Sequence, residues 1–137
     1  MVTNEQLIKE ALKARENSYS PYSGYRVGAA LLTQTGKVYL GTNVENCGYS
    51  PCNCAERSAL FAAVSCGERD FNKIAIVGSS EGICYPCGVC RQVLVELAPN
   101  CEIICAKDTT NYEVHSIWDL LPHAFTPVDT DYVKNKN

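Results

Sequence analysis

The chain has 137 residues, 46% of them hydrophobic and 20% charged, with a formal net charge of −3. This length suits one domain with a single core and is too short for two, so we expect residues 1–137 to form one domain. The negative charge argues against a nucleic-acid partner, because binding to phosphates rests on clustered Lys and Arg. No stretch is apolar for long enough to cross a bilayer, so a small ligand is expected rather than a membrane.

The first half of the chain predicts a helix followed by a hairpin. Thr3 and Gln6 form a capping box, and the apolar residues after them recur on one face of a helix that fades near residue 17. A loop containing Pro and Gly follows. Two apolar runs, residues 26–33 and 38–43, then flank a turn and predict a pair of strands.

The second half alternates helices and strands. A loop over residues 45–53 leads into a helix that begins at Ala55 and ends near Gly67. The elements expected after it are a strand at 74–77, a helix at 91–97, strands at 103–106 and near 112–114, and a short helix capped by Ser116. This order predicts one α/β domain with a mixed sheet. The polar tail, about residues 130–137, is expected to be loose.

Cysteine is unusually frequent, and the odd number excludes a complete set of disulfides within one chain. The nine are Cys47, Cys52, Cys54, Cys66, Cys84, Cys87, Cys90, Cys101 and Cys105. Residues 1–6 carry no secretory signal, so a cytoplasmic location is expected, and clustered cysteines there indicate metal ligands or reactive thiols. Cys101 and Cys105 accompany an apolar run, which favours core thiols.

Two segments carry most of the chemical information. Residues 54–56 read Cys-Ala-Glu, and residues 86–90 read Pro-Cys-Gly-Val-Cys. A closed structural zinc site uses four protein ligands, whereas a hydrolytic site leaves one position for water. Glu56, two residues from a thiolate, can move protons to and from such a water. Both segments fall at predicted helix starts, where thiolates are stabilised, and the combination is typical of zinc-dependent nucleobase deaminases.

Two other interpretations use the same cysteines. A four-cysteine structural zinc would add Cys52 to the set, and the cysteines alone do not separate it from an open three-cysteine site. Glu56 favours the open site because a structural zinc needs no acid, although acids are common in first helical turns. A redox Cys-x-x-Cys pair would leave residues 54–56 without a purpose.

An arginine directly follows each segment. Three thiolates on one Zn²⁺ leave a net negative charge, and a neighbouring cation or hydrogen-bond donor should offset it. We therefore expect Arg57, Arg91 or both to hydrogen-bond ligand sulfurs, with Gln92 beside them. Surface arginines are a poorer interpretation, because cations are disfavoured at helix starts.

The chain resembles the cytidine deaminase family, specifically its small-subunit, homotetrameric type. The resemblance is carried by six segments in order: 21–23 (Pro-Tyr-Ser), 27–31 (Val-Gly-Ala-Ala-Leu), 41–46 (Gly-x-Asn-x-Glu-Asn), 54–59 (Cys-Ala-Glu-Arg-Ser-Ala), 86–92 (Pro-Cys-Gly-x-Cys-Arg-Gln) and 120–125 (Leu-Leu-Pro-x-Ala-Phe). It implies a three-layer fold with a mixed five-stranded sheet flanked by helices, one Zn²⁺ per subunit, and a homotetramer with shared active sites. The implied reaction, in pyrimidine salvage, is hydrolytic deamination of cytidine and deoxycytidine to uridine and deoxyuridine.

The resemblance also implies roles for individual residues. Cys54, Cys87 and Cys90 would bind zinc while Cys52 does not, and Glu56 would be the proton shuttle. The substrate contacts it implies are Asn43 and Glu45 on the ribose hydroxyls, the Ala55 backbone N–H on the pyrimidine carbonyl, Tyr25 stacking near the base, and Tyr49 and Phe125 reaching across a subunit boundary. The i, i+2 spacing of Asn43 and Glu45 lets an extended segment direct both to one side.

Tyr85 departs from the family, which commonly has serine there, so the loop over residues 79–85 is expected to influence access and nucleoside preference. A deaminase of a related aminopyrimidine nucleoside would share the zinc centre. Glu45 disfavours a nucleotide because it would repel a nearby phosphate. A polynucleotide-editing deaminase would need a basic groove, and a zinc-stapled interaction module would need Cys52.

Overall fold

A five-stranded mixed sheet with the strand order β2-β1-β3-β4-β5 organises the computed structural model, which describes residues 1–127. The elements in chain order are α1 (Asn4–Arg15), β1 (Gly28–Thr33), β2 (Val38–Thr42), α2 (Ala55–Ser65), β3 (Phe71–Val77), α3 (Gly88–Leu97), β4 (Glu102–Ala106), β5 (Tyr112–Ser116) and α4 (Ile117–Leu120). Neighbouring strands are antiparallel except β3 and β4, which are parallel. The expected mixed five-stranded sheet is confirmed; the tail expected to be loose lies outside the described residues.

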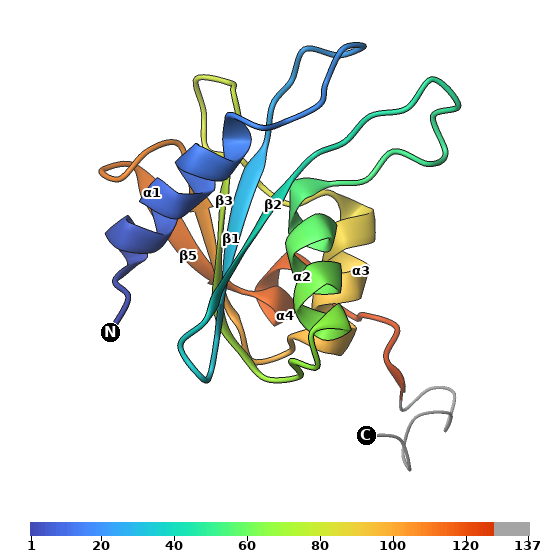
Figure 1. The fold of residues 1–137 in the computed structure, drawn as a ribbon. Coiled ribbons are helices and arrows are strands. Elements are labelled where there is room, and N and C mark those ends of the chain that lie inside the picture. Colours follow the sequence, from blue (N-terminus) through green and yellow to red (C-terminus); the bar gives the residue numbers. More distant parts are fainter. Residues whose placement is uncertain (128–137) are drawn as a thin grey trace.

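Helices cover both faces of the sheet, which gives three layers (Figure 1). The α1 helix packs on one face through Leu7, Ile8 and Ala11, against alternate residues of β1, β3 and β4. The other alternate residues of these strands pack against α2, α3 and α4. Because successive strand side chains point to opposite faces, a central strand such as β1 is buried throughout. Cys101 and Cys105 belong to this core, as expected.

Two glycines let helices approach the sheet closely. A Cβ at Gly28 would lie 2.0 Å from the Ala11 carbonyl oxygen of α1. A Cβ at Gly41 would lie 2.2 Å from the Ala55 carbonyl oxygen and 2.5 Å from the Ala59 nitrogen, both in α2. The first turn of α2 therefore rests directly on the backbone of β2, and this contact fixes the height of the Cys-Ala-Glu segment above the sheet.

Some element boundaries differ from the expectations. The α3 helix begins at Gly88 rather than residue 91, because Cys87 already has the extended backbone of an N-cap residue. The first strand begins at Gly28 rather than residue 26: the N–H groups of Arg26 and Val27 donate to the side chains of Ser79 and Asn43, at 2.8 and 2.9 Å, and not to a neighbouring strand. β3 begins three residues earlier than expected, at Phe71.

Three loops meet at one end of the sheet, where β1 begins and β2 and β3 end. Figure 1 shows the loops after α1, β2 and β3 extending from this end of the molecule, above the N-termini of α2 and α3. They comprise residues 16–27, 43–54 and 78–87. Among residues 1–127, no helix has the length and apolar character needed to cross a membrane.

Candidate active site

Three cysteines from two helix N-termini converge at this end of the sheet. Cys54 is the N-cap of α2, Cys87 is the N-cap of α3, and Cys90 lies in the first turn of α3. Their Sγ atoms lie within 4.8 Å of one another, and those of Cys54 and Cys87 are 3.5 Å apart. Neither N-cap cysteine uses its side chain to cap its helix, so both thiols are directed to the shared space.

The sulfur cluster fits a tetrahedral zinc ion. Zn–S bonds of about 2.3 Å place tetrahedral thiolates about 3.8 Å apart, which is close to the spacing found here. Within the described residues, one group of possible ligand side chains (His, Cys, Asp or Glu) is close enough together to hold a metal ion. It consists of Cys54, Cys87 and Cys90. Cys52 lies outside the group, and its Sγ accepts a hydrogen bond of 3.2 Å from the Asn46 backbone N–H. The arrangement is an open three-sulfur site.

Arg57 stabilises negative charge on the sulfurs. Its Nη2 donates to the Cys54 Sγ at 3.1 Å, across one turn of α2. The pKa of the Cys54 thiol is lowered to about 5, chiefly by a hydrogen bond with Cys90 and also by Arg57, although burial opposes the shift. The hydrogen bond with Cys54, together with burial, raises the pKa of the Cys90 thiol.

Arg91 and Gln92 point elsewhere. The Nε and Nη1 of Arg91 donate to the carbonyl oxygens of Pro86 and Leu120, at 2.8 and 2.7 Å. The Nε2 of Gln92 donates to the Phe125 carbonyl oxygen at 2.8 Å. These bonds tie α3 to the end of α4 and to the segment that follows it, and so hold the chain around Cys87 and Cys90 in place. We expected one or both arginines to reach a sulfur: Arg57 does, and Arg91 binds backbone carbonyl oxygens instead.

Glu56 is the acid beside the sulfur cluster. Only 3% of its surface is exposed, and it is the one charged side chain that is buried among residues 1–127. Burial raises its pKa to about 7, and the charge on Cys54 acts in the same direction. A carboxyl group with a pKa near neutrality can both accept and donate a proton at physiological pH.

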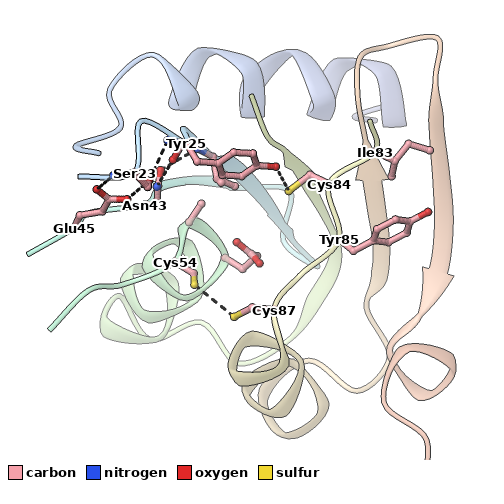
Figure 2. A pocket seen from close by; sticks show the side chains of 12 residues that line it. Ser23, Tyr25, Asn43, Glu45, Cys54, Ile83, Cys84, Tyr85 and Cys87 are labelled. Atoms are coloured by element: carbon pink, nitrogen blue, oxygen red, sulfur yellow. Dashed lines mark hydrogen bonds between the residues drawn. The ribbon is translucent and has the colours of Figure 1, made fainter. Parts of the chain in front are cut away.

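A cavity of about 460 Å³ connects the sulfur cluster with a polar end. At one end it is lined by Cys54, Ala55, Glu56 and Cys87, and at the other by Ser23, Asn43 and Glu45. Tyr25 and Cys84 form a further part of the wall, where the ring of Tyr25 extends from beside Asn43 toward Cys84 (Figure 2). Its size and its apolar wall with a few polar groups are typical of small-molecule sites.

The polar end is built by side chains that bind loop backbone. Asn43 donates from Nδ2 to the Tyr25 carbonyl oxygen at 2.8 Å and accepts from the Val27 N–H at 2.9 Å. The Oε1 of Glu45 accepts from the N–H groups of Tyr22 and Ser23, at 2.9 and 3.1 Å. The Ser23 hydroxyl donates to the other carboxylate oxygen, and it is the main cause of the lowered pKa of Glu45.

Of the remaining residues expected to contact the substrate, two line the cavity and two do not. Tyr25 and Ala55 line the cavity, and Ala55 begins α2, where backbone N–H groups have no partner within the helix. Tyr49 is 76% exposed and lines a neighbouring hollow of about 320 Å³. Phe125 is 61% exposed and lines neither. Within one chain, therefore, Tyr49 and Phe125 do not reach the cavity.

Four cavity residues had no individual role in the predictions: Ser23, Val27, Ile83 and Cys84. The Pro-Tyr-Ser segment at 21–23 offered a signal for Ser23, because a short polar motif within a loop favours function over packing. Cys84 lies three residues before Cys87, but sequence spacing does not show that its thiol faces the cavity. Val27 and Ile83 are ordinary apolar residues, and neither is marked individually by its residue type or by its neighbours in the sequence.

Comparison with known proteins agrees with this geometry. Residues 1–106 match the family model described as "Cytidine and deoxycytidylate deaminase zinc-binding region". The cytidine deaminase of Sporosarcina psychrophila is 46% identical over 129 residues, which cover 93% of this chain and 95% of that protein. The cytidine deaminase of Halalkalibacterium halodurans is 46% identical over 126 residues, covering 91% of this chain and 96% of that protein.

Solved structures show the same likeness. The crystal structure of cytidine deaminase from Burkholderia pseudomallei superposes with a TM-score of 0.87 at 50% identity, covering 90% of this chain and 99% of that one. The enzyme from Mycobacterium leprae gives a TM-score of 0.75 at 34% identity, with coverage of 88% and 99%. With its open three-sulfur site beside a buried glutamate, the chain belongs to the cytidine deaminase family of zinc-dependent enzymes.

Proposed function

We propose that the protein catalyses the hydrolytic deamination of cytidine and deoxycytidine to uridine and deoxyuridine, with release of ammonia. The observation that carries this proposal is the position of Glu56, buried beside three convergent sulfurs at one end of a cavity. A structural metal site has no use for a buried acid that can exchange a proton near neutral pH. Pyrimidine salvage in the cytoplasm, by a single domain over residues 1–137, is the corresponding proposed role.

Cys54, Cys87 and Cys90 would hold one Zn²⁺ per subunit, which would act as a Lewis acid and make water nucleophilic at neutral pH. Glu56 takes a proton from the attacking water and delivers it to the ring nitrogen next to the amino-bearing carbon. It then passes the second proton of that water to the departing amine, so that ammonia leaves and a carbonyl remains. General acid–base help of this kind is typically worth about 10²–10⁴-fold in rate.

The two ends of the cavity position a nucleoside. The free Ala55 N–H at the start of α2 would donate to the pyrimidine carbonyl, and the ring of Tyr25 would pack against the base. Asn43 and Glu45 would take the ribose hydroxyls at the polar end. A carboxylate there accepts hydrogen bonds from hydroxyls but repels a phosphate, so an unphosphorylated sugar is favoured over a nucleotide or a nucleic acid.

We also propose that the enzyme is a homotetramer in which neighbouring subunits complete each active site. Tyr49 and Phe125 are large aromatic side chains that are mostly exposed in a single chain. Exposed aromatic residues of this kind are enriched at protein interfaces. Contributed by a neighbouring subunit, they would close the cavity over the base.

The test is the loss of cytidine absorbance on mixing with purified, zinc-loaded protein. Deoxycytidine, cytidine monophosphate and an aminopyrimidine nucleoside with a substituted ring are run in parallel. Turnover of the two unmodified nucleosides with little turnover of the monophosphate supports the proposal. No absorbance change with either nucleoside would refute it, and preference for the substituted ring would indicate the related deaminase instead.

A further inference from the structure

The hydroxyl of Tyr25 joins two loops across the wall of the cavity. Tyr25 lies in the loop between α1 and β1, and its hydroxyl is 3.3 Å from the Ser80 Oγ and 3.7 Å from the Cys84 Sγ. Both partners belong to the loop between β3 and α3, which leads to Cys87. Figure 2 shows the ring of Tyr25 reaching across to Cys84. A phenylalanine could supply the same aromatic wall but neither hydrogen bond.

The same hydroxyl fills a narrow slot. A Cβ added at Gly78 would lie 2.2 Å from the Tyr25 hydroxyl oxygen and 3.1 Å from the Cys84 Sγ. The Gly78 carbonyl oxygen accepts from the Arg15 Nη1 at 2.7 Å, which anchors this glycine to α1. The Tyr25 hydroxyl oxygen therefore occupies the space that a side chain at position 78 would fill, and this space exists because residue 78 is a glycine.

We propose that the Tyr25 hydroxyl is a positioning group for the deamination reaction. By tying the loop over residues 16–27 to the loop over residues 78–87, it fixes the aromatic ring against which the base packs. This role rests on the proposed nucleoside function, but the loop–loop tie is a property of the protein without substrate. Tyr25 touches the base through its ring, and its hydroxyl acts only through the position of that ring.

Loss of the Tyr25 hydroxyl should weaken substrate binding more than it slows the chemical step. Without the tie, the ring keeps its apolar contacts but gains motion, and substrate has to immobilise it on binding. Neutral hydrogen bonds of this kind contribute modestly, which corresponds to about a two- to tenfold rise in KM. Glu56 and the sulfur cluster are untouched, so kcat should stay within about twofold.

The experiment compares four variants of the zinc-loaded enzyme: Tyr25→Phe, Ser80→Ala, the double substitution, and Tyr19→Phe as a matched control. Ser80 is outside the cavity lining, so its removal tests the tie without changing the surface that faces substrate. Tyr19 is exposed, and within the described residues its hydroxyl has no hydrogen bond. We expect raised KM in the first two variants, no further rise in the double variant, and wild-type values for Tyr19→Phe. An unchanged KM in Tyr25→Phe, or additive effects, would overturn the proposal.

A stability measurement tests the slot without any turnover. Gly78→Ala should push the Tyr25 hydroxyl out of its seat and lower the melting temperature, and Tyr25→Phe in the same chain should recover part of that loss. Additive losses in the two variants would show that the hydroxyl does not occupy the slot. If the wild-type protein failed to deaminate cytidine, this measurement would still decide whether the two loops are tied, so the two proposals can fail separately.

Discussion

The two ends of the cavity are built in different ways. The sulfur end stands on the first turns of two helices, and α2 is pressed onto β2 at Gly41. The polar end stands on loops that are held by bonds from side chains to backbone, chiefly those of Asn43 and Glu45. Secondary structure packed on a core holds a side chain more rigidly than such bonds do. Changes at the sulfur end should therefore abolish turnover or folding, and changes at the polar end should shift substrate binding.

The largest effect is expected at Glu56. Glu56→Gln keeps the size and shape of the side chain but cannot accept and release a proton, so kcat should fall by about 10²–10⁴-fold or more. Zinc content and melting temperature should remain close to wild type, because Glu56 is not needed as a ligand. The measurement is single-turnover deamination together with metal analysis. Near-normal turnover in this variant would refute the proton-transfer role.

The second prediction distinguishes a zinc site with three cysteine ligands from a structural site with four. Cys90→Ser should lose most of its zinc on dialysis, since Cys90 belongs to the convergent group. Cys52→Ser is the matched control and should retain zinc and activity, because its thiol bonds to the Asn46 backbone instead. Metal analysis of both variants provides the measurement. Zinc loss from Cys52→Ser would favour a closed, structural site.

The third prediction tests whether the close packing of α2 on β2 at Gly41 holds the three sulfurs in place. Gly41→Ala places a methyl group against backbone atoms of α2, which cannot rotate away, so unfolding free energy should fall by about 1–3 kcal/mol or more. Gly82→Ala serves as control because a Cβ there meets nothing within 4 Å. Chemical denaturation of both variants gives the comparison, and zinc affinity should fall with Gly41→Ala alone. Equal stability of the two variants would contradict the close packing.

A smaller effect, on binding, is expected at the polar end. Glu45→Gln replaces one acceptor oxygen by a donor amide that faces the N–H groups of Tyr22 and Ser23. Hydrogen bonds to an ionised carboxylate are roughly twice as strong as neutral ones, so KM for cytidine should rise by about tenfold or more. The exposed Glu16→Gln controls for the change in net charge. If kcat fell as much as kcat/KM, Glu45 would contribute to the chemical step, as expected of residues at the sulfur end, and not mainly to substrate binding.

The smallest effect is expected at Tyr85. Its hydroxyl donates to the Glu113 Oε1 at 2.8 Å, and the same oxygen lies 2.8 Å from the His115 Nε2. In Figure 2 its ring extends away from Cys54 and Cys87. Although Tyr85 lines the cavity, its side chain is exposed and its hydroxyl is held by Glu113, so Tyr85→Ser should change kcat and KM by no more than about threefold. A tenfold change in steady-state kinetics would place Tyr85 among the groups that select the nucleoside.

The fold class was predictable because its signals are local. The apolar runs at 26–33 and 38–43, the capping box at Thr3 and the turn before Val38 each specify an element within a few positions, and the order of elements restricts the sheet. The start of β1 differed from the expectation because distant side chains decided the structure there. The strand that was expected from residue 26 begins later because Ser79 and Asn43 take the N–H groups of Arg26 and Val27.

The site was only partly predictable, for the same physical reason. The sequence by itself determined which reactive groups are present: cysteine thiolates at helix starts, with a glutamate two residues from one of them. The cysteines alone left open whether Cys52 joins Cys54, Cys87 and Cys90, and the tertiary structure places it outside their group. Only the tertiary structure decided that Arg57 and not Arg91 reaches a sulfur, and that Tyr25 meets Cys84. Spacing along a chain fixes which residues share one helix or strand, but contacts between loops dozens of residues apart depend on how the core packs.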